Sequence, residues 1–179
     1  MERSLLTLFA ELASGGRTAD VGCGPGQVTA FLHEQGLDVF GVDLSPGMIE
    51  QARTNFPGLH FELGSMAALE QPDSSLSGLV AWFSAIHVPD VQLPGVLAEF
   101  RRVLITGAPL LLAFQVGDGP KHVSRAWGSE IDLTIHRRTP QTVSAMLGEA
   151  GFHVLAATVF EPAGRPGAQA ACVIADKLL

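Results

Sequence analysis

A glycine-rich turn is the part of this sequence best suited to holding a ligand. Residues 20–26 read Asp-Val-Gly-Cys-Gly-Pro-Gly, with a glycine at every second position from 22 onward. Glycine permits positive φ and lets a ligand approach the backbone closely. The dinucleotide fingerprint G-x-G-x-x-G spaces its last glycine differently, and Pro25 lacks the N–H that a pyrophosphate would use. The turn therefore favours a nucleoside ligand without a pyrophosphate, while three glycines alone leave a simple turn equally open.

A carboxylate follows at a spacing that suits a ribose. Asp43 lies 17 residues beyond Gly26, at the end of the next apolar segment. A carboxylate in that place can accept hydrogen bonds from both ribose hydroxyls. The alternative is that Asp43 only caps the helix beginning at Pro46, but Ser45 is available for that task. The combination with the glycine turn favours the ribose role.

Aromatic residues and a histidine end a later apolar segment. Trp82 and Phe83 would present aromatic faces that favour a cation and exclude water, or else pack in the core. His87 is placed to act as a general base, or else is a capping or surface histidine. His122, Trp127 and His136 fall in residues 117–138 and either line an acceptor pocket or face solvent. The spacing of the histidines does not predict a metal site.

The elements that must position these residues alternate between apolar runs and amphipathic stretches. Helices are expected near 5–12, 27–35, 46–56, 96–104 and 140–150 from apolar residues at helical spacing. Strands are expected at 18–21, 38–42, 59–63, 76–83, 109–116, 152–160 and 171–176. Such alternation predicts an α/β fold with a mostly parallel sheet covered on both faces. Ligands of such sheets bind at the carboxyl ends of the strands, where the turns above lie.

The composition limits the function classes. The chain has 179 residues, of which 47% are hydrophobic and 16% charged, so a folded single domain is expected. Its net charge of −7 argues against binding nucleic acid or an anionic membrane. Two distant cysteines, no secretory signal and no apolar run of membrane-spanning length indicate a reduced, cytoplasmic location. The oligomeric state is not readable.

These motifs together resemble the class I S-adenosylmethionine-dependent methyltransferases. Residues 18–26 look like that family's first motif and residues 42–48 like its second. Residues 97–112 are similar to its helix and fifth strand, and residues 149–152 to a late helix-to-strand turn. The resemblance implies a Rossmann-like, doubly wound, three-layer α/β/α fold with a seven-stranded sheet whose last strand is antiparallel. It also implies a single methyltransferase domain over residues 1–179.

The resemblance also implies roles for matching positions. Asp20 and the backbone of Gly22, Cys23, Gly24 and Gly26 would hold the methionine part of S-adenosylmethionine. Asp43 would hold the ribose, with Leu44 and Met48 near the adenine. The family commonly has an acidic residue after the third strand, where this chain has Ser65 and Met66. Ser65 can still accept a hydrogen bond from the adenine amino group, and Met66 offers contact area. Trp82 and Phe83 would lie beside the sulfonium.

The implied function is a transferase that moves a methyl group from S-adenosylmethionine to an unidentified small-molecule acceptor by in-line displacement, giving S-adenosylhomocysteine. A non-catalytic or weakly active cofactor-binding protein of the same fold is the alternative, and the glycine spacing disfavours an NAD-dependent oxidoreductase. Only 17 residues precede Thr18, so we expect an open cofactor cleft on that side. Residues 117–138 are expected to form a loop that acts as a lid over it, with Trp127 covering the site.

Overall fold

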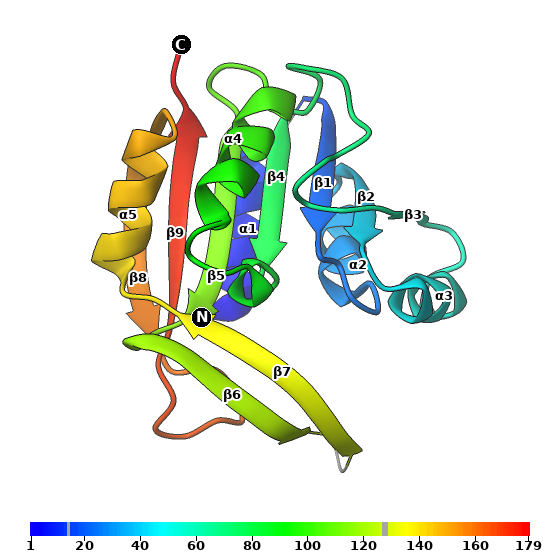
Figure 1. Cartoon of the computed structure of the whole chain (residues 1–179). Helices are drawn as coiled ribbons and strands as arrows, with labels where there is room; N and C mark the ends of the chain where they lie inside the picture. The colour runs from blue at the N-terminus through cyan, green and yellow to red at the C-terminus, as the bar shows by residue number, and fades with distance from the viewer. Residues whose placement is uncertain (14, 127–128) are drawn as a thin grey trace.

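The central feature of the fold is a seven-stranded sheet, seen in a computed structural model that describes residues 1–13, 15–126 and 129–179 (Figure 1). Its strand order is β3-β2-β1-β4-β5-β9-β8, and only β9 runs against its neighbours β5 and β8. This confirms the doubly wound fold with an antiparallel last strand. The strands are β1 (Arg17–Val21), β2 (Asp38–Asp43), β3 (His60–Leu63), β4 (Gly78–Trp82), β5 (Pro109–Gln115), β8 (Phe152–Phe160) and β9 (Ala170–Lys177).

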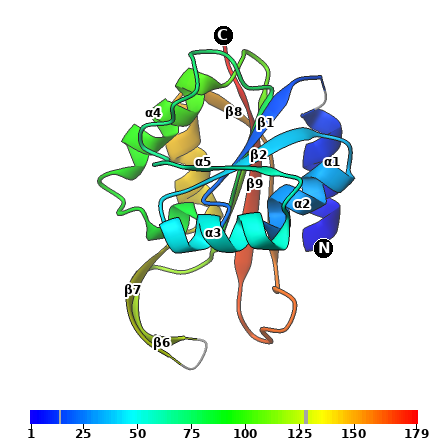
Figure 2. The same cartoon turned by 90° about the vertical axis from the view of Figure 1, so that its right-hand side faces the viewer.

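Helices cover both faces of the sheet. Figure 2 shows α1 (Glu2–Leu12) and α2 (Gln27–Glu34) on one side and α4 (Leu93–Val103) and α5 (Pro140–Glu149) on the other. The helix α3 (Pro46–Asn55) packs beside β2 and β3. Each helix buries an apolar stripe, with Phe9 and Leu32 on the first side and Phe100 and Leu147 on the second. No helix in the described part of the chain has the length and apolar character that a membrane crossing requires.

Two helices begin as their sequences predict. The Ser45 hydroxyl accepts a hydrogen bond from the Met48 amide at 3.4 Å, and the Thr139 hydroxyl accepts one from the Thr142 amide at 3.1 Å. A proline occupies the first helical position in both cases, where its missing N–H costs nothing. The cap of α3 is thus supplied by Ser45, which leaves Asp43 at the end of β2 for another task.

Residues 117–138 do not form the loop expected from the sequence. They contain β6 (Gly119–Ala126) and β7 (Ser129–Arg137), which pair antiparallel as a separate two-stranded hairpin. Figure 1 shows the hairpin projecting beyond the carboxyl edge of the main sheet. The sequence gives no clear strand signal here because much of the ribbon is exposed, so neither face requires a row of apolar residues. Trp127 and Gly128 lie outside the described residues.

The candidate site lies where the strand order reverses. β1 is flanked by β2 on one side and by β4 on the other, and the chain leaves β1 toward β2. The carboxyl ends of these three strands therefore meet beside the glycine turn. Ligands of open α/β sheets bind in the crevice at this switch point.

Candidate active site

The three glycines of the first turn differ in why the position requires a glycine. Gly22, Gly24 and Gly26 all have positive φ, at 72°, 53° and 90°. A Cβ on Gly22 would lie 2.2 Å from the Ser84 Cβ, and one on Gly26 would lie 2.8 Å from the Phe61 ring. A Cβ on Gly24 would meet no protein atom within 4 Å. Gly22 and Gly26 are therefore required by packing, whereas Gly24 faces open space.

Asp43 ties the glycine turn to the end of β2. One carboxylate oxygen, Oδ2, accepts a hydrogen bond from the Gly24 amide at 2.8 Å, and Oδ1 accepts one from the Ser45 amide at 2.9 Å. The side chain is only half-buried. A carboxylate has about four acceptor positions, so Asp43 retains capacity for two further donors. The structure thus gives Asp43 a structural task without removing its ability to accept ribose hydroxyls.

The other amides of the glycine turn are also used within the protein. Gly22 and Cys23 donate to the Val42 carbonyl at 2.7 and 3.0 Å, and Gly26 donates to the Cys23 carbonyl at 3.1 Å. Pro25 has no N–H to offer. A pyrophosphate needs several free amides at such a turn. The turn therefore suits a ligand that needs no free backbone amides, and it does not suit a pyrophosphate. This agrees with the preference inferred from the sequence.

Asp20 lies buried beneath the turn with half of its carboxylate unsatisfied. Its Oδ2 accepts a hydrogen bond from the Thr29 hydroxyl at 2.7 Å, whereas its Oδ1 has no partner in the described residues. Burial raises the pKa of Asp20 to about 7, against a lowering by hydrogen bonds from Thr29 and a further rise from the charge of Asp43. A buried acceptor without a partner calls for a donor. A ligand ammonium group would supply both the donor and a compensating charge.

Cys23 provides shape rather than reactivity. Its side chain is buried and its Sγ lies 3.6 Å from the Gly24 carbonyl. Burial, with the charges of Asp20 and Asp43, raises the pKa of the Cys23 thiol far above its ordinary value. The neutral thiol is not a nucleophile under these conditions.

Apolar side chains stand exposed beside the second and third turns. Leu44 is 74% exposed, Leu63 is 54% exposed and Met48 is 41% exposed. The third turn is fastened to the second because the Gly64 amide donates to the Asp43 carbonyl at 3.0 Å. Ser65 accepts a hydrogen bond from the Ala67 amide, and Met66, partly buried, packs against the core. This exposed apolar surface suits a flat, apolar ligand face such as a purine.

The turn after β4 contains backbone strain that the sequence does not reveal. Phe83 has a φ of 53°, a conformation uncommon for a residue other than glycine. Its amide donates to the Ala113 carbonyl, and its ring packs edge-on against Trp82 with centroids 5.5 Å apart. The next residue, Ser84, donates to the Val21 carbonyl at 2.6 Å and contacts Gly22. The strained turn is thereby held directly against the glycine turn, as is common at functional sites.

His87 lies at the end of a short 3-10 helix, η1 (Ala85–His87), which packs against β7. The residue is exposed, but surrounding atoms partly desolvate the ring and lower the pKa of His87. The backbone of Thr134 and the charge of Asp43 oppose this effect, and His136 adds to it. The fold therefore brings both Asp43 and His136 within electrostatic range of His87. A lowered pKa keeps the imidazole neutral at pH 7, the form that accepts a proton.

Arg138 fixes this short helix, although it is not among the residues singled out from the sequence. Its side chain is 3% exposed, and it donates to the carbonyls of Ala85 and Val88 and to the carboxylate of Asp90. The arginine thus binds the base of the hairpin to both sides of His87. No local sequence pattern reveals this contact, because about 50 residues separate Arg138 from its partners.

A pocket of about 680 Å³ opens at the same edge of the sheet, between the end of β5, the base of the hairpin and the β8–β9 loop. Sequence reasoning did not identify its polar residues. Among the residues that line it are Phe83, Gln115, Lys121, Arg137, Arg165 and Gln169. The predicted acceptor residues lie elsewhere on the hairpin. His122 is exposed, 3.6 Å from Asp132, and His136 pairs with Pro120. Strand alternation puts these two histidines on the face opposite Lys121 and Arg137.

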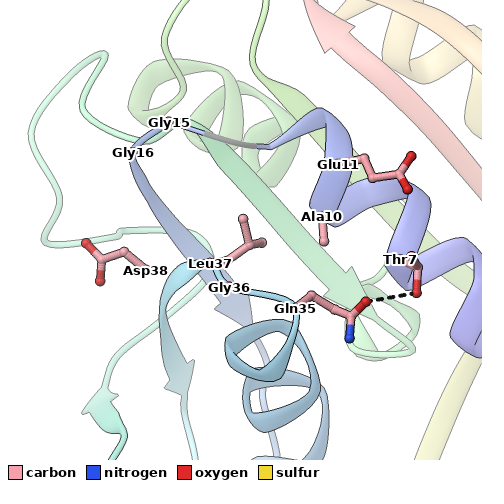
Figure 3. A pocket seen from close by; sticks show the side chains of 9 residues that line it. All are labelled: Thr7, Ala10, Glu11, Gly15, Gly16, Gln35, Gly36, Leu37 and Asp38. Atoms are coloured by element: carbon pink, nitrogen blue, oxygen red, sulfur yellow. Dashed lines mark hydrogen bonds between the residues drawn. The ribbon is translucent and has the colours of Figure 1, made fainter.

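A second pocket, of about 610 Å³, lies at the opposite edge of the sheet. Figure 3 shows it between α1, the residues that precede β1 and the turn between α2 and β2. Glu11 and Asp38 are its charged residues, and Thr7 bonds to Gln35 across it at 3.3 Å. It contains none of the residues singled out from the sequence. The arrangement at the carboxyl edge is therefore the better candidate for chemistry.

The fold is a Rossmann-like domain, and the glycine turn, the two aspartates and the exposed apolar surface at its carboxyl edge suit a nucleoside ligand without a pyrophosphate. A family model described as "Methyltransferase domain" matches residues 19–107. The chain belongs to the class I S-adenosylmethionine-dependent methyltransferases, and S-adenosylmethionine is the cofactor of this family.

Individual methyltransferases are similar to the chain in sequence and in structure. The chain is 42% identical over 119 residues to trans-aconitate 2-methyltransferase of Methylobacterium nodulans, covering 62% of this chain and 43% of the relative. It is 30% identical over 118 residues to malonyl-[acyl-carrier protein] O-methyltransferase of Serratia marcescens, covering 63% and 44%. The chain therefore spans less than half the length of these two relatives. Its structure resembles an S-adenosylmethionine-dependent methyltransferase from Methanosarcina mazei, with a TM-score of 0.81, 24% identity, and coverage of 91% and 92%.

Proposed function

We propose that this protein transfers the methyl group of S-adenosylmethionine to a small-molecule acceptor by in-line displacement. The observation that carries the proposal is the buried Asp20, whose unpartnered oxygen lies beneath a glycine turn with no amide left for a pyrophosphate. This combination suits a ligand that carries an ammonium group and a nucleoside but no phosphate. S-adenosylmethionine has both features.

Each part of the cofactor has residues of matching chemistry. Asp20 would accept from the ammonium group of the methionine part, with the backbone at Gly22, Cys23, Gly24 and Gly26 shaping its path. Asp43 would accept the ribose hydroxyls with its remaining capacity. The adenine would lie against Leu44 and Met48 and meet the third turn at Ser65 and Met66. Trp82 and Phe83 would lie near the sulfonium, where aromatic faces favour a cation.

The protein would promote methyl transfer by orienting the cofactor and the acceptor and by excluding water from the site. When bound, S-adenosylmethionine supplies a methyl group on a positively charged sulfur, which is already a good leaving group. The strained turn at Phe83 would hold the residues beside the methyl acceptor against the glycine turn and so position the acceptor. Closure of the hairpin would exclude water from the reacting groups. His87 would take the proton from an acceptor hydroxyl or amine, because its lowered pKa keeps it neutral.

The relatives do not select one acceptor. Their names specify trans-aconitate and malonyl-[acyl-carrier protein], which differ greatly in size. A cofactor-binding protein with little turnover is the second candidate, favoured by the absence of an acidic residue at the third turn, where Ser65 stands. Assays of methyl transfer to a panel of small acceptors would separate the two candidates.

Calorimetry with S-adenosylhomocysteine and NAD tests the cofactor assignment. We expect S-adenosylhomocysteine to bind with saturable heat and NAD to give none, because the glycine turn has no free amides for a pyrophosphate. Gly24→Val serves as a control, since a β-branched residue suits neither a φ of 53° nor close approach of a ligand. Binding of NAD without binding of S-adenosylhomocysteine would overturn the proposal.

A further inference from the structure

The pocket at the carboxyl edge is locally positive, although the chain as a whole is negatively charged. The chain as a whole carries a net charge of −7, yet Lys121, Arg137 and Arg165 all line this one pocket. Glu2 is the acidic residue among those that line it. Three cations facing one carboxylate leave a local positive excess. Such an excess attracts anions and repels cations, most strongly at low ionic strength.

These three cations are not used in ion pairs within the described residues. Elsewhere in the protein Arg17 pairs with Glu62, Arg102 with Glu99 and Asp73, and Arg138 with Asp90. Arg137, at the end of β7, instead donates to the backbone carbonyls of Asp118 and Gly119, at the start of the neighbouring strand β6. Those bonds orient the guanidinium and leave part of its donor fork available. A guanidinium that is oriented but not neutralised is well suited to binding a planar anion.

The pocket lies beside the proposed site of methyl transfer. Phe83 lines the pocket, and the adjacent Ser84 contacts Gly22 of the glycine turn. A ligand in the pocket would therefore lie next to the residues assigned to the cofactor. Gln115 and Gln169 also line it, and their amide groups can donate to oxygen atoms.

We infer that this pocket binds the methyl acceptor through a carboxylate, held by Lys121, Arg137 and Arg165, and that the acceptor is a small organic acid. The inference rests on the proposed function and narrows its acceptor class. The fork of an arginine matches the two oxygens of a carboxylate, and the flanking amides add donors in an open, hydrated pocket. The part of the ligand near Phe83 would carry the atom that is methylated.

The test is a titration followed by nuclear magnetic resonance with S-adenosylhomocysteine present. Malonate and citrate are the probes, uncharged malonamide is the matched control, and inorganic phosphate tests for general anion binding. The signals are the side-chain N–H groups of Arg137, Arg165, Gln115 and Gln169. We expect saturable shifts with malonate and citrate, weaker binding as salt is added, and little response to malonamide or phosphate.

Substitutions test whether the arginines of the pocket cause the binding that the resonance shifts report. Arg137→Gln combined with Arg165→Gln should weaken malonate binding about tenfold, a modest effect because both side chains are partly or fully exposed. Arg101→Gln, which removes one positive charge near the chain end at Leu179, is the control matched to each single variant. Its affinity for malonate should remain within about twofold of the wild type. Each single variant gives the same information if the double variant fails to fold.

Four results would overturn the inference: no saturable shifts with either acid, equal shifts with malonamide, phosphate binding in place of the acids, or unchanged affinity in the folded variants. Separate calorimetry with S-adenosylhomocysteine distinguishes the two proposals. If S-adenosylhomocysteine binds but the acids do not, only the acceptor class is wrong. If the acids bind at these residues and S-adenosylhomocysteine does not, the proposed function fails while the anion pocket remains.

Discussion

Asp20 is the residue whose chemistry depends most on its surroundings. In the unfolded chain its carboxyl has an ordinary pKa of 3.8, whereas burial raises the pKa to about 7 in the folded protein. The folded state therefore keeps a proton that the unfolded state loses between these values. A group of this kind stabilises the fold fully below pH 3.8, and its contribution is lost as the pH rises through 7.

We expect Asp20→Asn to remove this pH dependence from the ligand-free protein. Between pH 5 and pH 8 the free energy of unfolding of the wild type should fall by roughly 2–3 kcal/mol more than that of the variant, because asparagine does not ionise. Urea unfolding at several pH values measures the difference. Equal slopes in the two proteins would show that Asp20 titrates normally.

Asp43→Ala separates a ligand contact from a structural tie. The change removes a carboxylate that accepts from the Gly24 and Ser45 amides, so we expect a loss of about 1–3 kcal/mol in stability without unfolding. If the carboxylate also holds the ribose, S-adenosylhomocysteine affinity should fall by more than about tenfold. Calorimetry on the folded variant decides the matter. An unchanged dissociation constant would leave Asp43 with only its structural task.

His87→Ala tests the proposed general base. For an acceptor whose hydroxyl or amine must lose a proton, turnover should fall by roughly 10²–10⁴ with cofactor affinity intact. For a carboxylate that is itself methylated, no proton need leave, and turnover should fall by less than about threefold. Steady-state assays with acceptors of both kinds, alongside calorimetry, measure the two effects. A large loss with both kinds would assign His87 to positioning rather than to proton removal.

At the scale of elements, the hairpin and η1 form one connected unit. Arg138 at the end of the hairpin donates to carbonyls on both sides of His87, and β7 packs against η1. A movement of the hairpin would therefore be transmitted to His87. The base of the hairpin also supplies Lys121 and Arg137 to the pocket. Closure of the hairpin would thus bring together the acceptor contacts and the candidate base.

Hydrogen exchange tests whether this hairpin acts as a lid. We expect residues 117–138 to gain protection when S-adenosylhomocysteine and an organic acid are bound, because closure would bury their exposed amides. Residues 152–160, in β8, provide the internal control and should not change. Unaltered exchange in the hairpin of a protein that binds both ligands would contradict the lid.

The predictability of the elements follows from their burial. The strand at residues 152–160 has the bounds that the sequence predicts, and the other six predicted strands match within two residues at either end. The central strands could be found because both of their faces are buried, which requires continuous apolar runs such as Leu110–Phe114. The hairpin could not be found because exposed residues such as Lys121 and His122 carry no apolar period.

At the scale of the whole molecule, the site was only partly accessible from the sequence. Asp20, Gly24 and Asp43 could be placed together because they lie at or just beyond the carboxyl ends of two successive strands, which meet at one edge of a parallel sheet. The pocket could not, since it joins Phe83, Lys121, Arg137 and Arg165 from four separate segments. Its composition depends on how the hairpin and the β8–β9 loop fold back. The strain at Phe83 was equally hidden, because residue type does not reveal a positive φ.

The direction of β9 has a practical consequence for handling the protein. Because β9 runs against its neighbours, the chain ends at the edge of the sheet away from the β6–β7 hairpin, where Figure 1 marks the C-terminus. Glu2, at the other end of the described chain, lines the pocket itself. A fusion partner or sensor-chip linker attached after Leu179 would leave the ligand entrance facing the solution. The same attachment before Met1 would crowd that entrance and lower apparent affinities for reasons unrelated to recognition.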